Sequence, residues 1–260
     1  MRTLSVIIIS KNEEDRITPC LESVKDLADE IIVFDSSSTD KTVEIVKRYT
    51  DKVWITEDWP GDGFQKQRAL DQATCDWVLN IDADEYLCEK MKAEIREVLT
   101  QESLEEVAFK LPWGNIILGD LMRFGRSARA IKRLFKRDGG SFTLVKVHGF
   151  IETTGKVGTL RKGLLMHNSL RSFDHWLHKS TTYSWETTLK YFQRRRPSLG
   201  IPFAILRSFW TFFLIYIIRL GFLDGNRGLM VAVMFSQSSF NKYAGLWYLE
   251  QERKMKKNQK

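Results

Sequence analysis

The chain has 260 residues, 43% of them hydrophobic, which allows one large domain or a domain with an extension. Its three cysteines have no Cys-x-x-Cys spacing, which argues against a disulfide framework or a zinc site and fits a reducing compartment. The net charge of +7 combines an acidic front with a basic back: residues 1–100 hold 13 Lys and Arg against 22 Asp and Glu, and residues 101–260 hold 27 against 11. The front is suited to a cation; the back is suited to phosphates or an anionic membrane, or is simply a solvated basic surface.

Strand and helix patterns alternate through the first 85 residues. The chain goes straight into a strand pattern, so we expect no signal peptide. Short apolar runs typical of strands buried on both faces alternate with helical patterns. We expect strands at 5–9, 30–35, 52–56 and 77–81, and helices at 17–27, 41–49 and 64–73. This order predicts a parallel sheet with crossover helices.

Acidic side chains follow three of the four expected strands, namely Glu13, Asp35, and Asp82 with Asp84. In an open α/β sheet these strand ends lie at one edge, where ligands bind. Asp82 and Asp84 are two residues apart, so they point to the same side if the extended backbone persists. Such a pair suits a divalent cation held between protein and substrate phosphates, although an acidic helix start would also explain it. Neither a dinucleotide fingerprint nor a P-loop is present.

These motifs, in this order, resemble glycosyltransferase family 2. The resemblance is carried by Ser5–Asn12 with Glu13, by Asp35-Ser36-Ser37-Ser38-Thr39-Asp40, by Gly63-Phe64-Gln65-Lys66-Gln67-Arg68 and by Asp82-Ala83-Asp84. Within the family, the chain is most similar to bacterial lipopolysaccharide-core glucosyltransferases that act on heptose, and residues 219–225 are also similar to theirs. The resemblance implies the GT-A fold and an inverting transfer from a nucleotide-sugar. We therefore expect an α/β fold, a GT-A Rossmann-like, mostly parallel sheet over residues 1–195, with a C-terminal helical extension over 196–260.

The resemblance also implies a role for each motif residue. Glu13 and Asp35 would contact the uracil and ribose of a UDP-sugar, and Asp82 would lie near the ribose. Asp84 would bind the Mg²⁺ or Mn²⁺ that bridges the diphosphate. Lys66 and Arg68 would lie beside the donor; the alternative for this pair is an exposed helix face.

The catalytic base is expected in residues 147–152. An inverting transfer needs a carboxylate or imidazole to accept the proton of the acceptor hydroxyl. Relatives carry a glutamate directly after the histidine, but here Gly149 follows His148, so the base is either Glu152 or His148. Further along, His167 is a candidate ligand of the metal or diphosphate, with a core histidine as the alternative.

Two later segments indicate contact with anionic partners. Seven Lys and Arg residues crowd positions 123–137, which favours an anionic acceptor such as a phosphorylated saccharide, or a solvated face. We expect no nucleic acid there, because interleaved aromatic residues and a recognised reading motif are missing. Residues 201–222 are the most apolar stretch, but Arg207 and Arg219 bracket too few residues for an easy membrane span. A helix in the membrane interface fits, as does a buried core helix. The basic residues 253–260 are expected to be disordered and attracted to anionic lipid.

The sequence therefore predicts an inverting glycosyltransferase. It would move a sugar, with UDP-glucose as the expected donor, to a lipid-linked saccharide in lipopolysaccharide-core biosynthesis. We expect it in the cytoplasm, peripheral on the inner face of the cytoplasmic membrane. The alternatives are a processive polysaccharide synthase, a nucleotidyltransferase and a non-enzymatic basic module that binds nucleic acid.

Overall fold

The computed structural model describes residues 2–125, 129–146, 149–168 and 170–258. The chain forms two compact units. The α/β unit comprises Met1–Gly114 and Arg129–Ser169, and the helical unit comprises Asn115–Ala128 and Leu170–Lys260. Each unit is described by itself below.

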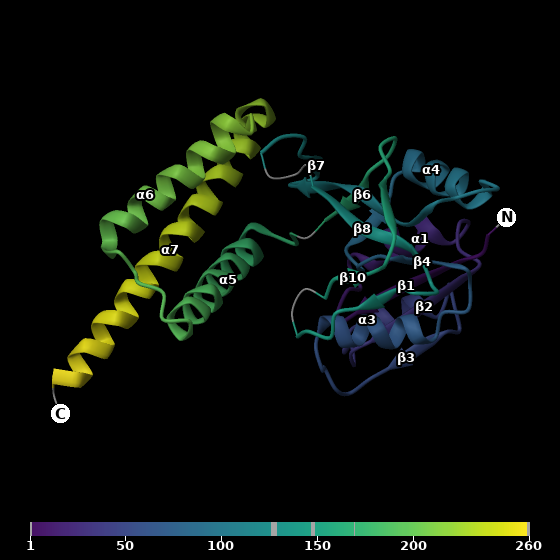
Figure 1. Ribbon diagram of the computed structural model, residues 1–260, viewed down its shortest axis with the longest axis horizontal. Helices are drawn as coiled ribbons and strands as arrows, with labels where there is room; N and C mark the ends of the chain where they lie inside the picture. Colours follow the sequence, from purple (N-terminus) through teal and green to yellow (C-terminus); the bar gives the residue numbers. More distant parts are fainter. Residues whose placement is uncertain (1, 126–128, 147–148, 169, 259–260) are drawn as a thin grey trace. The chain divides into compact units, whose positions relative to one another are not determined.

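Parallel strands form the first half of the sheet in the α/β unit (Figure 1). Strands β1 (Leu4–Ser10), β2 (Glu30–Asp35), β3 (Val53–Ile55) and β4 (Trp77–Asn80) lie in the order β3-β2-β1-β4. The neighbouring pairs are all parallel. Helices α1 (Ile17–Val24), α2 (Thr42–Val46) and α3 (Asp62–Asp71) connect them. The predicted alternation and the predicted parallel sheet are both confirmed.

The apolar run of β1 explains why this strand lies in the middle of the sheet. Val6 and Ile8 pack into the hydrophobic cluster that contains Ile17 and Leu21 of α1. Ile7 points to the opposite face and packs into the cluster that contains Leu70 of α3. Because both faces of the strand are buried, side chains on both faces are apolar, and the sequence of the strand is continuously apolar.

Antiparallel strands complete the sheet. Strand β8 (Arg129–Lys136) pairs with β4, and β6 (Glu106–Ile117) pairs with β8. Strand β12 (Leu165–His167) pairs with β5 (Glu85–Leu87), which leads into α4 (Glu89–Thr100), while β11 (Lys156–Thr159) runs parallel to β6. Strands β9 (Ser141–Phe142) and β10 (Ile151–Glu152) form a separate two-stranded sheet. The pairing of β6 with β8 skips Arg133, which makes this residue part of a β-bulge.

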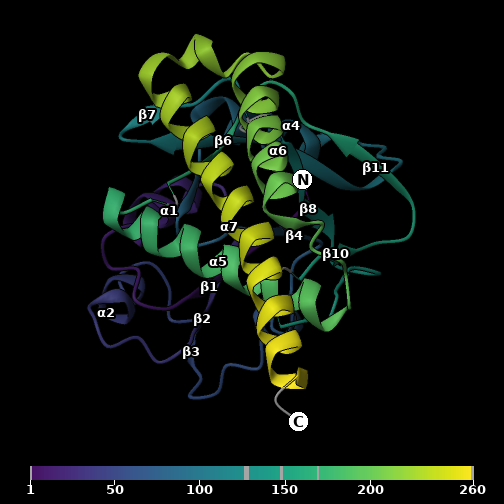
Figure 2. The ribbon, with the colours of Figure 1, turned by 90° about the vertical axis from the view of Figure 1, so that its left-hand side faces the viewer.

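The helical unit is built from long helices that lie side by side (Figure 2). Helices α5 (Phe173–Gln193) and α6 (Gly200–Phe213) both pack on α7 (Gly225–Asn258). A π-helical segment η1 (Leu214–Ile218) continues α6, and a 3₁₀ turn η2 (Gly221–Asp224) leads into α7. The short β7 (Asp120–Leu121) pairs with the end of β6. The core of the unit gathers Trp176, Ile215, Val231, Ala232 and Met234.

This division differs from the predicted boundary at 195/196. Helix α5 belongs to the helical unit because small polar side chains tie it to α7. The hydroxyls of Ser180 and Ser238 lie 2.5 Å apart, and the Thr188 hydroxyl donates to the Lys242 carbonyl at 2.9 Å. The prediction of a disordered basic tail is wrong as far as Asn258, because α7 continues to that residue.

One helical segment is long and apolar enough to cross a membrane, judged by length and composition alone. Among the described residues, this is Gly200–Ile218, which has 19 residues, a mean hydropathy of 1.8 and only 11% of its window buried. This segment is longer than the stretch that Arg207 and Arg219 bracket in the sequence. The difference arises because α6 begins before Arg207 and continues past it. The alternative of a buried core helix is therefore wrong for most of this segment.

Glu30 is a buried carboxylate that makes the α/β unit sensitive to acid. Burial raises the pKa of Glu30, but the Lys52 ammonium and the donors of Ser5 and Thr74 outweigh it and lower the pKa from 4.5 to about 2. A lowered pKa stabilises the fold above the unfolded value and loses that effect as pH falls from 4.5 towards 2. Glu30→Gln should therefore destabilise the protein by about 1–2 kcal/mol at pH 7, which is less than the full pKa shift corresponds to because solvent screens the half-exposed Lys52, and by progressively less at lower pH.

Urea unfolding of both proteins between pH 3.5 and pH 7 measures this difference. Glu44→Gln is the matched control, because Glu44 pairs with Arg48 on an exposed helix face and should change stability little. A difference between wild type and Glu30→Gln that stays constant with pH would contradict the prediction.

Candidate active site

The loops after β1 and β2 are joined into one rim at the carboxyl edge of the sheet. The Asn12 backbone N–H donates to the Ser38 hydroxyl at 2.8 Å, and the Thr39 N–H donates to the Asn12 side-chain oxygen at 2.8 Å. Asn12 and Ser37 both have φ of +54°, in the left-handed region, where Asn is one of the better tolerated residues. These bonds hold the two loops together, so residues 12–13 and 35–38 act as a single wall.

Asp35 supports this wall from inside. The side chain is fully buried, and it accepts hydrogen bonds from the Ser10 hydroxyl, the Ser38 hydroxyl and the Ser38 N–H at 2.6–2.7 Å. The chain's own donors enclose the Asp35 carboxylate and so shape the loop that carries Ser36, Ser37 and Ser38. The predicted contact of Asp35 with uracil and ribose stays a prediction.

The acidic turn after β4 is anchored by two buried cations. Asp82 accepts from Lys66 Nζ at 3.0 Å through Oδ1 and from Arg133 Nη2 at 2.6 Å through Oδ2. The same Arg133 nitrogen lies 2.7 Å from Glu85 Oε1, while Glu85 Oε2 accepts from the Asp82 N–H at 3.0 Å. Glu85 is fully buried, so its carboxylate lies inside the unit and not at the open edge of the sheet. The turn is thus closed on itself as well as held from β8 and α3.

The charges in this network set its pKa values. Although burial favours the neutral acid, Arg133 and Lys66 lower the pKa of Asp82 far below its usual range. Burial, reinforced by the neighbouring Asp82 carboxylate, raises the pKa of Glu85 to about 7. Burial also opposes the charge on Lys66, but Asp82 and Asp62 raise the pKa of this ammonium, so it stays protonated at neutral pH. Asp82 therefore belongs to a fixed ion cluster.

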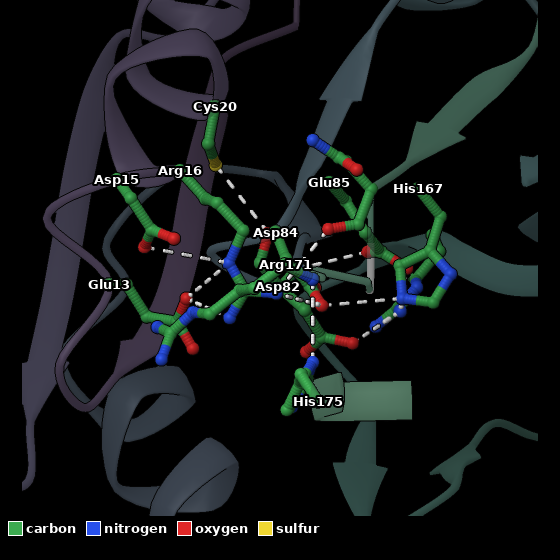
Figure 3. A network of polar contacts seen from close by, with 12 residues as sticks. Glu13, Asp15, Arg16, Cys20, Asp82, Asp84, Glu85, His167, Arg171 and His175 are labelled. Carbon is green, nitrogen blue, oxygen red and sulfur yellow. Dashed lines mark hydrogen bonds and ion pairs between the residues drawn. The ribbon is translucent and has the colours of Figure 1, made fainter. Parts of the chain in front are cut away.

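Asp84 points to a different set of partners (Figure 3). Its Oδ2 lies 3.4 Å from His167 Nε2 and 3.6 Å from Arg16 Nη1. Pairing of β12 with β5 brings His167 here, and the Asn168 N–H donates to the Asp84 carbonyl at 2.9 Å. Burial raises the pKa of Asp84, but the His167 contact outweighs it and the net effect is a lowered pKa. In the described part of the α/β unit, the side chains that contact Asp82 differ from those that contact Asp84, and the backbone turns between the two residues instead of staying extended.

The pair of Asp84 and His167 fits a divalent cation that also binds substrate. Two neighbouring ligands of an octahedral Mg²⁺ lie about 3 Å apart, close to the 3.4 Å between Asp84 Oδ2 and His167 Nε2. Within the described part of the chain, no cluster of three or more His, Cys, Asp or Glu side chains could form a complete cage. Mg²⁺ commonly needs only one or two protein ligands when phosphates supply the rest.

Trp113 holds the His167 ring in place. The two rings stack with centroids 4.3 Å apart and an angle of 24°. The Trp113 indole N–H is buried without a hydrogen-bond partner among the described residues, and the same holds for Asn80 Oδ1 and Arg133 Nε. These three residues lie on β6, β4 and β8, which are neighbours in the sheet. Unpaired buried polar atoms are rare in folded proteins, and several gathered beside an acidic turn are typical of a polar ligand or water site.

Glu13, Lys66 and Arg68 have different surroundings. Glu13 Oε2 accepts from Arg16 Nε at 2.9 Å, which links the first loop to Asp84 through one guanidinium. Lys66 lies within the acidic cluster, so the alternative of an exposed helix face is wrong for this residue. Arg68 instead donates two hydrogen bonds to the Asp58 carboxylate on the surface, at 2.7 and 2.8 Å. The alternative of an exposed helix face therefore fits Arg68.

The expected base segment approaches the site through Gly149. The Gly149 N–H donates to Asp62 Oδ2 at 2.7 Å, and Asp62 Oδ1 lies 3.0 Å from Lys66 Nζ. A Cβ on Gly149 would meet the Cα of Gly63 at 2.4 Å. Because of this close backbone approach, any side chain at position 149, including the glutamate that the family resemblance predicts there, would require the chain to move. His148, the other candidate base, lies outside the described residues.

Glu152 is exposed on β10. It lines a shallow depression with Gln67, Ser141, Phe142, Thr143 and Leu144. The Phe142 N–H donates to Gln67 Oε1 at 2.8 Å, which fixes this depression against α3.

Three residues of this site carry no signal in the sequence. Arg16 lies in a loop, Asp62 in a break-rich segment, and Arg133 within a run of surface-type cations. Their partners are distant in the chain: Arg133 contacts residues 48 and 51 positions away. The apolar neighbours Leu134 and Phe135 mark β8 as a strand, but they do not indicate which cation turns inward.

Comparison with known proteins places this arrangement in a family. Residues 5–111 match the family model described as Glycosyl transferase family 2. A protein of Rickettsia prowazekii named "Uncharacterized glycosyltransferase RP128" is 30% identical over 257 residues, which cover 95% of this chain and 87% of that protein. The "Lipopolysaccharide core biosynthesis glycosyltransferase LpsC" of Rhizobium meliloti is 35% identical over 191 residues, covering 70% of this chain and 68% of LpsC.

A solved structure supports the fold. The chain is similar to the crystal structure of Staphylococcus aureus TarS 1–349 in complex with UDP, with a TM-score of 0.51 at 15% identity. The match covers 96% of this chain and 92% of that one. At this identity the likeness concerns the fold alone, which is the predicted GT-A architecture with a helical region after it.

Proposed function

The chain belongs to glycosyltransferase family 2, and from that premise we propose that it transfers a sugar, with glucose expected, from a UDP-sugar to a lipid-linked saccharide of the cell envelope. The observation that carries this proposal is the pairing of Asp84 with His167 at the carboxyl edge of the sheet, beside the Lys66–Asp82–Arg133 cluster. Two of the similar proteins support the choice of donor and acceptor: TarS was crystallised in complex with UDP, and LpsC is named for lipopolysaccharide-core biosynthesis.

The donor's diphosphate is the group for which this edge is best suited. Asp84 and His167 would hold Mg²⁺ or Mn²⁺, which supplies positive charge to offset the charge that develops on the leaving UDP. Arg16 and Lys66 add fixed cations on either side of the acidic turn. Preorganised charges of this kind stabilise a leaving group without reorganising during the reaction. The wall of residues 12–13 and 35–38 is the proposed seat of the nucleoside, with Glu13 at its edge and Asp82 holding the turn next to the ribose.

The acceptor side is proposed to face a membrane. Helix α6 exposes large apolar side chains, among them Ile205, Leu206, Phe209 and Trp210, each 48–65% exposed. Exposed apolar surface of this kind, with Arg207 within the helix and Arg219 after η1, is typical of a helix lying in a membrane interface. We therefore place the protein on the inner face of the cytoplasmic membrane, where a lipid-linked acceptor and a cytoplasmic nucleotide-sugar meet.

A donor panel tests the function. Purified protein with Mg²⁺ or Mn²⁺ should release UDP from a UDP-sugar, with UDP-glucose preferred over GDP- and dTDP-sugars, when a membrane extract supplies the acceptor. Release of sugar 1-phosphate from the UDP-sugar, with the uridylyl group passed to pyrophosphate or another acceptor, would indicate a nucleotidyltransferase. Salt-dependent retention on DNA without binding of any nucleotide-sugar would contradict the proposal and favour a nucleic-acid module.

The catalytic base is proposed to be Glu152 or His148, and paired variants separate them. If Glu152 accepts the proton, Glu152→Gln should lower kcat about a hundredfold or more and leave UDP affinity unchanged, because Gln keeps the shape but cannot accept a proton. If His148 is the base, His148→Gln should give that result and Glu152→Gln should be mild.

The rate profile adds a second readout. An unperturbed histidine gives an acidic limb near pH 6–7, whereas an unperturbed glutamate gives one near pH 4. Near-normal kinetics in both single variants would show that neither residue is the base.

A further inference from the structure

A cluster of cations stacked on two tyrosines lies between the helices of the helical unit. We call it the tyrosine–cation cluster: Tyr191 of α5, Tyr243 and Lys242 of α7, Arg207 of α6, and Arg196 after α5. The ring centroids of Tyr191 and Tyr243 are 6.2 Å apart. Lys242 Nζ lies 5.6 Å from the first centroid and 4.6 Å from the second, so it is shared by both rings.

The two arginines complete the cluster from either side. Arg196 Cζ lies 4.6 Å from the Tyr191 centroid, and Arg207 Cζ lies 5.7 Å from the Tyr243 centroid. Among the described residues, the buried Nε of Arg207 has no hydrogen-bond partner, and neither arginine side chain has a carboxylate partner. The nearby Glu250 is bound instead to the hydroxyl and N–H of Ser198. A guanidinium stacked on a ring keeps its N–H edge available, and that edge matches the geometry of a phosphate.

The apolar surface next to the cluster is on the same helix. Arg207 lies one residue after Leu206, which is 61% exposed, and two before Phe209, which is 65% exposed. Phe203, one turn earlier, packs edge-on against Tyr243 with centroids 5.2 Å apart. The cluster therefore adjoins a strongly exposed apolar helix face. A soluble phosphate ligand has no apolar part that could cover this face, whereas a phospholipid has acyl chains next to its phosphate.

Charge favours the same kind of partner. Residues 170–260 hold 15 Lys and Arg against 5 Asp and Glu. Such an excess is attracted to an anionic bilayer surface, and aromatic rings commonly lie at headgroup depth.

We propose that the tyrosine–cation cluster binds the phosphate of an anionic phospholipid headgroup while the exposed face of α6 enters the boundary with the acyl chains. Arg196 and Arg207 donate to the phosphate oxygens, and Lys242 supplies charge between the two rings. This inference rests on the proposed membrane location, and it adds a defined headgroup site to what would otherwise be a diffuse attraction.

Vesicle binding of the full chain tests the site. Co-sedimentation is measured with phosphatidylcholine vesicles and with vesicles containing one third phosphatidylglycerol. The double variant Arg196→Gln/Lys242→Gln should bind the anionic vesicles about tenfold more weakly than wild type, and the matched variant Lys254→Gln/Lys257→Gln should lose less than about threefold. Both remove two positive charges from the same unit. Arg207→Lys keeps the charge but loses the fork, and it should also weaken anionic binding.

Several outcomes would overturn the proposal. Equal losses in the cluster and tail variants would show diffuse attraction, and equal binding to neutral vesicles would show that the phosphate is not recognised. Displacement by millimolar glycerol phosphate would indicate a free phosphate ligand. If the double variant does not fold, as judged by its thermal melt, the exposed Arg196→Gln alone provides the comparison. UDP binding by calorimetry should be unchanged in every variant, so a failure of UDP binding in the wild type would count against the proposed function and not against this site.

Discussion

Arg133→Met should strongly destabilise the α/β unit. Arg133 is 7% exposed and holds Asp82 and Glu85 through one nitrogen at 2.6 and 2.7 Å. Methionine fills much of the volume but removes the cation from both carboxylates. Glu85, whose pKa already lies at about 7, must then bind a proton or stay charged in the core. Removing one partner of a buried ion pair costs about 3–5 kcal/mol, which for a protein of this size lowers Tm by roughly 6–20 °C.

Urea unfolding and thermal melts measure this loss of stability. Two further variants show whether the loss comes from the buried ion cluster. Arg48→Met makes the same change at an exposed pair with Glu44 and should cost about 0.5 kcal/mol or less. Arg133→Met/Glu85→Gln removes the orphaned charge as well and should recover part of the lost stability. A loss in Arg133→Met no larger than in Arg48→Met would show that the cluster does not hold the turn.

The first half of the fold could be predicted because its strands are buried on both faces. Runs such as residues 5–9 and 30–35 are continuously apolar, and each ends where polar side chains begin, so both the strands and the ligand edge are visible in the sequence. The helix limits were less accurate: the helix predicted at 41–49 is only Thr42–Val46. The residues beyond Val46 form turns that satisfy their own backbone groups, and periodicity alone cannot distinguish these from a helix.

The site itself was predictable in its residue types and not in its connections. Asp82 and Asp84 were expected to point to one side, but the backbone turns between them. Asp82 therefore contacts Lys66 and Arg133, whereas Asp84 contacts His167 and Arg16. Arg133 could not be separated from the other cations of residues 123–137, because its inward direction depends on a bulge in the pairing of β6 with β8. Such a feature is set by two strands together and leaves no trace in either one.

Asp84→Asn should abolish transfer while the fold remains intact. Asparagine keeps the shape of the side chain and an oxygen that can still accept hydrogen bonds from His167 and Arg16, so we expect the variant to fold. The amide has no negative charge to hold a divalent cation against the donor diphosphate. Loss of an electrostatic contact to a developing charge costs on the order of 10²–10³ in kcat.

Three measurements distinguish the metal role from a folding defect. They are turnover, the thermal melt, and Mn²⁺ binding in the presence of UDP, which is measured by calorimetry. Asp138→Asn is the matched control, because the Asp138 side chain is 92% exposed and should leave all three readouts unchanged. EDTA should stop the wild-type reaction, and excess Mg²⁺ or Mn²⁺ should restore it.

Because His167 would be the second ligand, His167→Ala should weaken Mn²⁺ binding in the same assay, and Trp113→Leu should weaken it less by releasing the His167 ring. Full turnover of Asp84→Asn, or of the wild type in EDTA, would remove the cation from the mechanism and leave Arg16 and Lys66 as the groups that offset the diphosphate charge.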